Sequence, residues 1–168
     1  MKPTAHYSAT QDLKALSVLI VDDDKSFLRL LTSVLQSLGH CVIASENKSK
    51  LATELAISHR PDIAIVGAGA PPWNGILTAQ SVLRHYDVPI IICLDQADAE
   101  TLSKITETNI LSCLVKPFSP AQLVSNICMA MAQHNGLHAT ELDRPAAEIS
   151  DTVATNTSTK NPTFSAGY

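Results

Sequence analysis

The sequence has few aromatic residues and lacks the long apolar runs, basic clusters and secretory signal that are typical of membrane, nucleic-acid-binding and secreted proteins. Aromatic residues make up 4% of the 168 residues, and no apolar run approaches the roughly 20 residues of a membrane-spanning helix. The net charge is −4, from 12 basic and 16 acidic residues, and the basic residues do not cluster. The N-terminus, "MKPTAHYSATQD", lacks the apolar segment of a secretory signal. We therefore expect a cytoplasmic protein that binds neither membranes nor nucleic acid directly.

The cysteines lack the spacing of a metal or redox motif. Cys41, Cys93, Cys113 and Cys128 are far apart, no C-x-x-C is present, and their neighbours are largely apolar. This pattern predicts buried thiols in a reducing compartment. A redox pair between Cys93 and Cys113 stays open, because both are expected on neighbouring strands.

What the sequence does contain is five short apolar runs that alternate with five segments of helical pattern. In Ser26–Leu38 the apolar residues fall on one side of a helix, and Gly39 follows as a helix-ending glycine. Ser119 and Pro120 are typical of the start of a last helix. The expected strands are 17–21, 40–44, 63–66, 88–94 and 111–115, and the expected helices are 26–38, 47–59, 76–86, 97–107 and 120–133.

This alternation predicts an α/β protein. Connections of this length require parallel strands with right-handed crossovers, so we expect a three-layer αβα sandwich around a five-stranded parallel sheet. We expect a polar leader over residues 1–14, one folded domain over 15–134 and a disordered tail over 135–168, which is rich in Thr, Ser and Asn. A docking peptide around Phe164 and Tyr168 is the alternative for the tail.

The residues that follow the strands are the candidates for function, because ligands of open parallel sheets bind beyond the carboxyl ends of the strands. The first strand leads into Asp22, Asp23 and Asp24, and the fifth leads into Lys116. Adjacent carboxylates repel each other unless a cation joins them. Lys116 supplies one such charge, and Mg²⁺ could supply more. The third strand, by contrast, ends in Gly67, which has no functional group.

Four stretches together resemble the receiver domain of bacterial two-component response regulators. They are "VLIVDDDKSFLRLLTSVLQSLGH", "RPDIAIVGAGAPPWNG", "VPIIICL" and "LVKPFSPAQL", in the order and spacing of that family. The resemblance covers about Ser17 to Gln133. It implies a flavodoxin-like (βα)5 fold with strand order 2-1-3-4-5 and a function in two-component or phosphorelay signalling.

The resemblance assigns roles to three residues that are present. Asp22 and Asp23 match the acidic pair that holds Mg²⁺ in the family. Lys116 matches the lysine that contacts the phosphoryl group. These positions imply that the electrostatic part of a phosphorylation site is retained.

Three other positions have lost the family's chemistry. Gly67 stands where the family carries the aspartate that accepts a phosphoryl group from a histidine kinase, so no aspartyl phosphate can form there. Leu94 replaces the Ser or Thr whose hydroxyl responds to the phosphoryl group in the family. Cys113 replaces the aromatic residue that acts as a switch on the fifth strand. Asp62 cannot substitute, because five residues of strand, about 16 Å, separate it from this edge.

These losses predict an atypical single-domain receiver, a pseudo-receiver that is not an enzyme and that acts through protein contact, independently of phosphorylation. We expect weak residual Mg²⁺ binding at Asp22 and Asp23, and a direct pair between Lys116 and one of them. The expected partner is a histidine kinase, a phosphotransfer protein or another regulator, and the chain is expected to be a monomer or a weak homodimer. Candidate partner contacts are Trp73, in the loop after the third strand, and Met129, opposite the core stripe of the last helix.

Two other interpretations compete with this one. The run "DDDKS" resembles the D-x-D-x-S nucleophile motif of haloacid-dehalogenase-type phosphatases, in which Asp22 would attack phosphate and Asp24 would act as acid and base. That family also needs a later acidic pair after a strand, and none is present in the sequence. The "GAG" of residues 67–69 suggests dinucleotide binding, but the two prolines that follow block the helix required by that fingerprint.

Overall fold

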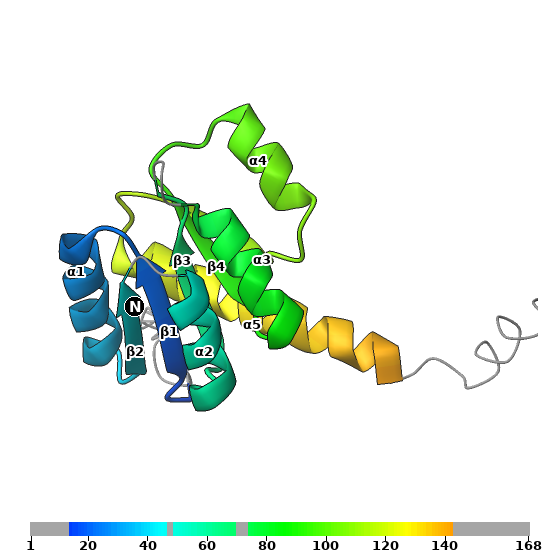
Figure 1. Ribbon diagram of the computed structural model, residues 1–168. Coiled ribbons are helices and arrows are strands. Elements are labelled where there is room, and N and C mark those ends of the chain that lie inside the picture. The colour runs from blue at the N-terminus through cyan, green and yellow to red at the C-terminus, as the bar shows by residue number, and fades with distance from the viewer. Residues whose placement is uncertain (1–13, 47–48, 70–73, 143–168) are drawn as a thin grey trace, which may run out of the picture.

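The computed structural model describes residues 14–46, 49–69 and 74–142. Over these residues five strands and five helices alternate along the chain, as the sequence predicted (Figure 1). The strands are β1 (Ser17–Asp22), β2 (Cys41–Glu46), β3 (Ile63–Gly67), β4 (Ile90–Leu94) and β5 (Ser112–Val115). The helices are α1 (Lys25–Ser37), α2 (Ser49–His59), α3 (Gly75–His85), α4 (Ala99–Thr106) and α5 (Pro120–Leu142).

The strands form one parallel sheet in the order β2-β1-β3-β4-β5. The predicted αβα fold and its strand order are therefore confirmed. Ile65 of β3 pairs with Ile20 of β1 on one side and with Ile91 of β4 on the other. Because all strands run in the same direction, their carboxyl ends lie at one edge, and this brings Asp22 and Gly67 close together.

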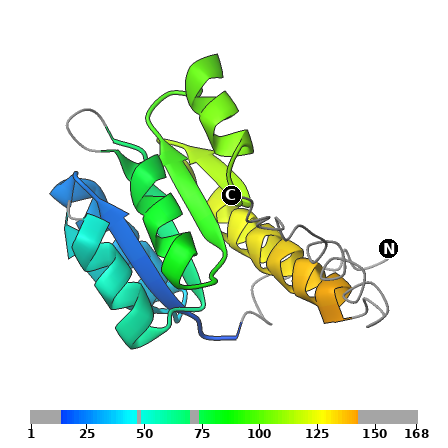
Figure 2. The same cartoon turned by 45° about the vertical axis from the view of Figure 1, so that its right-hand side comes forward.

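Helices cover both faces of the sheet (Figures 1 and 2). α1 and α5 pack on the face that carries Val18, Ile20 and Ile65, whereas α2 and α3 pack on the face that carries Leu19 and Val66. Successive residues of a strand point to opposite faces. Because both faces are covered, the central strands are apolar throughout, which is why the sequence showed continuous apolar runs instead of alternating ones.

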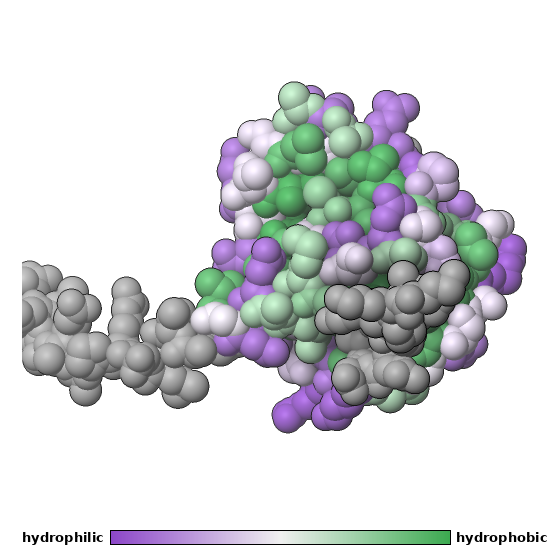
Figure 3. Space-filling model, turned by 180° about the vertical axis from the view of Figure 1, so that it is seen from behind, coloured by the Kyte–Doolittle hydropathy of each residue, from purple (hydrophilic) through white to green (hydrophobic). Residues whose placement is uncertain are grey.

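α4 stands away from this sandwich in both ribbon views. Ile105 is its one buried residue, and Leu102 of α4 and Val115 of the edge strand β5 are both exposed. Seen from behind, hydrophobic side chains gather in the region where α4 stands over β5 (Figure 3). The sequence predicted the helix, but not that it would leave the edge strand partly uncovered.

The last helix is longer than predicted. α5 continues to Leu142, past the expected end near Gln133, so residues 135–142 of the expected tail are helical. No proline interrupts this stretch, and a single glycine, Gly136, is tolerated within a helix. Neither α5 nor any other helix in the described part of the chain has the length and apolarity needed to span a membrane. Phe164 and Tyr168 lie outside the described residues.

The prediction that all four cysteines are buried is wrong for three of them. Cys93 is buried in β4, whereas Cys41, Cys113 and Cys128 are exposed. The exposed cysteines lie on the edge strands β2 and β5 and on the solvent side of α5, where apolar sequence neighbours do not ensure burial. Cys93 and Cys113 lie on adjacent strands, but their register is offset by one residue, so their side chains face opposite sides of the sheet.

Candidate functional site

The candidate site lies at the carboxyl edge of the sheet, where an aspartate and a lysine form a buried ion pair. Lys116 Nζ lies 2.8 Å from Asp22 Oδ2. The side chain of Asp22 is 2% exposed and that of Lys116 is 15% exposed. The other carboxylate oxygen of Asp22 accepts the backbone N–H of Asp24 at 2.8 Å. The predicted pairing of Lys116 with an acid of the first strand is thus confirmed, and its partner is Asp22.

Further groups surround the ammonium of Lys116. Asp95 Oδ1 lies 3.5 Å from Nζ, and the ring centroid of Phe27 lies 4.0 Å from it, a cation–π arrangement. Phe118 packs edge-on against Phe27, with 5.9 Å between ring centroids. Burial acts to lower the pKa of Lys116, but the hydrogen bond and negative charge of Asp22 outweigh it, so the net shift of the pKa is upward. Lys116 is therefore a fixed cation at neutral pH.

Gly67 makes room for this ion pair. A Cβ atom on residue 67 would come closer than 3.0 Å to both Oδ2 and Cγ of Asp22. The Asp22 carboxylate therefore occupies the space in which a side chain of residue 67 would begin, and the two groups cannot coexist in this arrangement. The sequence showed that a functional group is missing at Gly67, and the structure shows that the neighbouring acid fills the space.

A second glycine closes the same edge. Gly75, the first residue of α3, packs so closely on the Gly67 carbonyl that a Cβ atom would collide with the backbone of residues 67 and 68. The N–H of Gly75 donates to the Ala68 carbonyl at 2.9 Å, and the N–H of Ala68 donates to the Cys93 carbonyl at 2.8 Å. The start of α3 is thereby held directly against the ends of β3 and β4.

The other two acids of the D-D-D run have different environments. Asp24 is the N-cap of α1, and its carboxylate accepts the N–H groups of Ser26 at 2.8 Å and Phe27 at 3.3 Å. These hydrogen bonds lower the pKa of Asp24. Partial burial and the neighbouring Asp22 raise the pKa of Asp23. Because Asp24 is held as a carboxylate in a helix cap, the geometry gives no support to its role as the proton donor of a phosphatase.

The other residues that the sequence comparison with receivers singled out, Leu94, Cys113 and Asp62, do not join the ion pair of Asp22 and Lys116. Leu94 is fully buried in the core on the α2–α3 face, and Cys113 is exposed on β5. Asp62 lies at the opposite end of the sheet, where its carboxylate accepts the N–H of Ser17 at 2.7 Å. Asp22 therefore fills the space beside Gly67 and is the nearer of two acids, Asp22 and Asp95, that contact Lys116 among the described residues.

The residues at this edge do not fit a magnesium ion in their present arrangement. Both oxygens of Asp22 are engaged, by Lys116 and by the N–H of Asp24, and Gly67 offers no carboxylate. Mg²⁺ demands a near-octahedral set of oxygen ligands. Over the described ranges, no group of three or more His, Cys, Asp or Glu side chains could hold a metal ion. Metal binding at Asp22 and Asp23 thus stays a prediction.

Of the two candidate partner contacts, one can be placed. Met129 is 54% exposed, while Leu123, Ile127 and Ala130 of the same helix are fully buried, as the helical pattern predicted. Trp73 lies outside the described residues.

Sequence reasoning missed three residues that shape the site: Phe27, Phe118 and Gly75. The chain has 3 phenylalanines, and two of them lie within three residues of the candidate Asp24 and Lys116. Because the chain has so few aromatic residues, the closeness of Phe27 and Phe118 in sequence to Asp24 and Lys116 could have indicated that they belong to the site.

Two histidines on α5 also have a spacing that is typical of metal ligands. His134 and His138 are four residues apart. His134 Nε2 lies 3.1 Å from Asp87 Oδ1, whereas the position of the His138 side chain is outside what the structure describes.

Fold and sequence together identify the family. The sequence matches the response regulator receiver domain family over residues 18–128. The chain therefore belongs to the response regulator receiver domain family, whose members are signalling modules of two-component systems.

Individual relatives agree with this assignment. The chain is 25% identical over 138 residues to the transcriptional regulatory protein PdtaR of Mycobacterium tuberculosis, covering 82% of this chain and 66% of that protein. It is 30% identical over 118 residues to the probable transcriptional regulator ycf27 of Guillardia theta, covering 70% of this chain but 46% of that protein. The chain thus spans less than two thirds of the length of these relatives.

Solved structures show the same fold. The receiver domain of a modulated diguanylate cyclase from Desulfovibrio desulfuricans superimposes with a TM-score of 0.67 at 29% identity, covering 74% of this chain and 99% of that one. The chemotaxis protein CheY4 of Vibrio cholerae superimposes with a TM-score of 0.62 at 24% identity, covering 68% and 98%, a likeness in fold alone.

Proposed function

We propose that this chain is an atypical receiver that signals through protein contact without becoming phosphorylated. The observation that carries the proposal is the position of the Asp22 carboxylate, which fills the space beside Gly67 and holds Lys116. An aspartyl phosphate requires a carboxylate oxygen that can reach a phosphoryl donor. Gly67 has no such oxygen, and Asp22 is 1% exposed with both oxygens engaged.

The side chains that would bind or respond to a phosphoryl group are also either already paired or missing. The positive charge of Lys116 is already paired with the carboxylates of Asp22 and Asp95. Leu94 has no hydroxyl to bond a phosphoryl oxygen. Cys113 is too small to act as an aromatic switch. We infer a cytoplasmic, non-enzymatic binding module whose partner is a histidine kinase, a phosphotransfer protein or another regulator.

A partner surface on the side of α4, β5 and α5 is supported by exposed apolar residues. Leu102, Val115 and Met129 lie on these three elements and are all exposed. The hydrophobic area near α4 in Figure 3 belongs to the same side of the molecule. Exposed apolar side chains that gather on one side of a soluble domain are typical of a protein interface.

Phosphorylation itself can be tested directly. The full chain is incubated with acetyl phosphate and Mg²⁺ and its intact mass is measured, with a phosphorylatable receiver in the same reaction as a control for the reagent. We expect no gain of a phosphoryl group on this chain. The Gly67→Asp variant is expected to be phosphorylated at most partially, because Asp22 obstructs the new side chain and Leu94 is unchanged.

The Asp22→Asn variant makes this experiment decisive. A phosphoryl adduct on the native chain that disappears in Asp22→Asn would show that phosphorylation depends on the Asp22 carboxylate, as acceptor or as Mg²⁺ ligand, and the proposal would then be wrong. An adduct that survives in Asp22→Asn would show an acceptor elsewhere, and phosphorylation independence would again have to be abandoned.

A further inference from the structure

A buried histidine joins the starts of the first two strands. His40 lies between α1 and β2 and is 4% exposed. The N–H of Leu16, just before β1, donates to Nδ1 of His40 at 3.2 Å, and the Leu16 carbonyl accepts the N–H of Cys41 at 2.8 Å. The backbone N–H of His40 donates to the carbonyl of Leu35, in the last turn of α1, at 3.0 Å. The imidazole is therefore held where α1, β1 and β2 meet.

These contacts define the protonation state of the His40 ring. Because Nδ1 accepts a hydrogen bond, it carries no proton, and the proton of the neutral ring is on Nε2. Nε2 is buried, and no atom among the described residues accepts its hydrogen. A charged ring at the same place would be less stable still, because burial disfavours the charged form and lowers the pKa of His40.

No charged group in the described part of the chain compensates for this burial. The elements around His40 carry the following charged or titratable side chains at this edge of the sheet: Lys14, Cys41, Arg60, Asp62, Asp87 and His134. The carboxylate of Asp62 accepts the N–H of Ser17 at 2.7 Å, and that of Asp87 lies 3.1 Å from His134 Nε2. Burial is the one cause that shifts the pKa of His40, so none of these groups stabilises a proton on its ring.

We propose that His40 is an acid-sensitive switch, in which a proton taken up at Nδ1 displaces the N–H of Leu16 and releases the start of β1 from the start of β2. A protonated Nδ1 is a hydrogen-bond donor, so two buried N–H groups would then face each other without an acceptor. Release would uncover the apolar end of the core, where Leu16 is 7% exposed and Leu35 is fully buried.

The pH range of the switch follows from the direction of the pKa shift. The folded state binds the proton of His40 more weakly than the unfolded state does. The stability that neutral His40 contributes is therefore complete above pH 6.5 and is lost as pH falls from 6.5 toward the lower pKa of the folded state. A mildly acidic medium is thus the input that this switch would detect.

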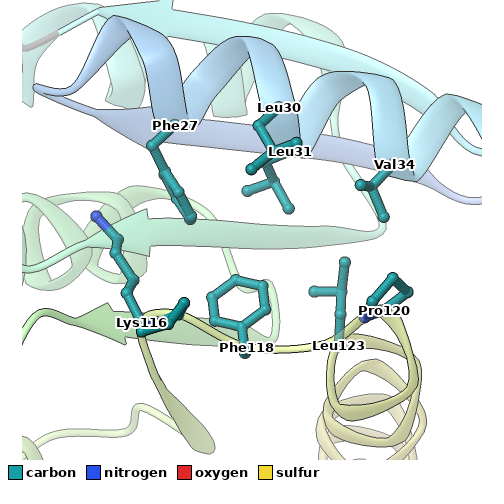
Figure 4. A pocket seen from close by; sticks show the side chains of 9 residues that line it. Phe27, Leu30, Leu31, Val34, Lys116, Phe118, Pro120 and Leu123 are labelled. Carbon is teal, nitrogen blue, oxygen red and sulfur yellow. The ribbon is translucent and has the colours of Figure 1, made fainter.

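The switch lies away from the ion pair of Asp22 and Lys116. Figure 4 looks into the pocket between α1 and the segment that joins β5 to α5, and it shows Phe27 beside Lys116 and Val34 farther along α1, in the direction of His40. Asp22 is the last residue of β1, whereas the His40 ring binds the residue before that strand. The proposal therefore does not rest on the proposed function.

NMR of the full native chain tests the switch directly. The imidazole of His40, titrated from about pH 8 to about pH 5, should take up its proton below pH 6.5. The exchange rate of the Leu16 amide, corrected for the chemical pH dependence of exchange, should rise by up to about tenfold for each pH unit below 6.5, which is the slope of one proton taken up on opening. The amide of Ala68, which donates to the Cys93 carbonyl at the opposite edge of the sheet, should not show this slope.

Two variants separate His40 from the other titrating groups. In His40→Asn a side-chain oxygen can still accept the N–H of Leu16, but the position no longer titrates, so the acid-dependent rise in Leu16 exchange should be lost. His85→Asn is the matched control, because His85 is exposed on α3, and this variant should exchange like the native chain.

Three results would overturn the proposal, and the first two need no variant. Proton uptake by His40 at or above pH 6.5 would show that the fold does not hold the ring neutral. An equal acid dependence of exchange at Leu16 and Ala68 would show that acid unfolds the whole domain and that no local switch exists. A slope at Leu16 that is unchanged in His40→Asn would assign the proton to another group.

Discussion

Replacement of Lys116 by methionine tests the ion pair that fills the site. The methionine side chain would retain the apolar stem against Phe27 and Phe118 but would leave the Asp22 carboxylate with the single N–H of Asp24 as a partner. Breaking a buried ion pair on one side typically costs about 3–5 kcal/mol. Asp22 lies at the sheet edge beside exposed Asp23, where water can approach, so we expect a loss of about 2–3 kcal/mol in the free energy of unfolding.

The partner substitution completes a double-mutant cycle. Asp22→Asn keeps a carbonyl oxygen for the Asp24 N–H and leaves Lys116 beside Asp95 at 3.5 Å, so its expected cost is about 1–2 kcal/mol. In Lys116→Met with Asp22→Asn no charge of the pair is left buried, and the double variant should be more stable than the sum of the single losses predicts, by about 1–2 kcal/mol.

Urea denaturation followed by circular dichroism measures all four proteins. The m-values should agree within error, so that differences in midpoint report stability. Additive losses, with a coupling energy below about 0.5 kcal/mol, would mean that Asp22 and Lys116 do not interact in the folded protein.

Four further outcomes are expected. Gly75→Ala should destabilise the fold by about 2 kcal/mol or more, because its Cβ atom would collide with the Gly67 backbone. Gly136→Ala should raise stability by up to about 1 kcal/mol, because its Cβ atom would meet nothing within 4 Å. If urea denaturation found Gly75→Ala the more stable of the two, the close packing at the start of α3 would be refuted. Gly67→Ala should cost about 1–3 kcal/mol in the native chain and less in an Asp22→Ala background, because the obstructing carboxylate is then absent. An equal cost in both backgrounds would mean that Asp22 does not fill the space. The raised pKa of Lys116 implies that its stabilising contribution is complete below pH 10.5 and is lost as pH rises through the higher pKa of the folded state. The native chain should therefore lose more stability in alkali than Lys116→Met. Parallel plots of the free energy of unfolding against pH for the two proteins would exclude a contribution of Lys116 ionisation to stability. Mg²⁺ titration by calorimetry should give a dissociation constant of about 1 mM or weaker, and micromolar binding would show that Asp22 and Asp23 form a working metal site.

The fold could be predicted from the sequence because local and global signals agree. The run Ile63–Val66 is apolar without interruption, which is what a strand covered on both faces requires. The amphipathic pattern of 26–38 likewise indicated a helix on one face of the sheet. Strand order followed from the family resemblance, and the structure places the strands in that order.

The site could be predicted only in part. The pairing of Lys116 with a first-strand acid was accessible from the sequence, because opposite charges at the ends of parallel strands converge on one edge. That Asp22 would enter the space above Gly67 was not, since it depends on the separation of two strands in the folded sheet. The exposure of Cys113 also escaped prediction, because α4 stands away from the sheet and leaves the edge strand β5 partly uncovered (Figures 1 and 2), which the helical pattern of α4 does not indicate.

The most direct test of the filled site is a crystal structure of the native chain soaked with Mg²⁺ and beryllofluoride, a mimic of a phosphoryl group on aspartate. We predict that Lys116 Nζ remains within hydrogen-bonding distance of Asp22 and that no beryllofluoride is bound at this edge. Beryllofluoride on Asp22, with Lys116 turned toward the fluorides, would show that the ion pair opens to accept a phosphoryl group and that the chain is a phosphorylatable receiver after all.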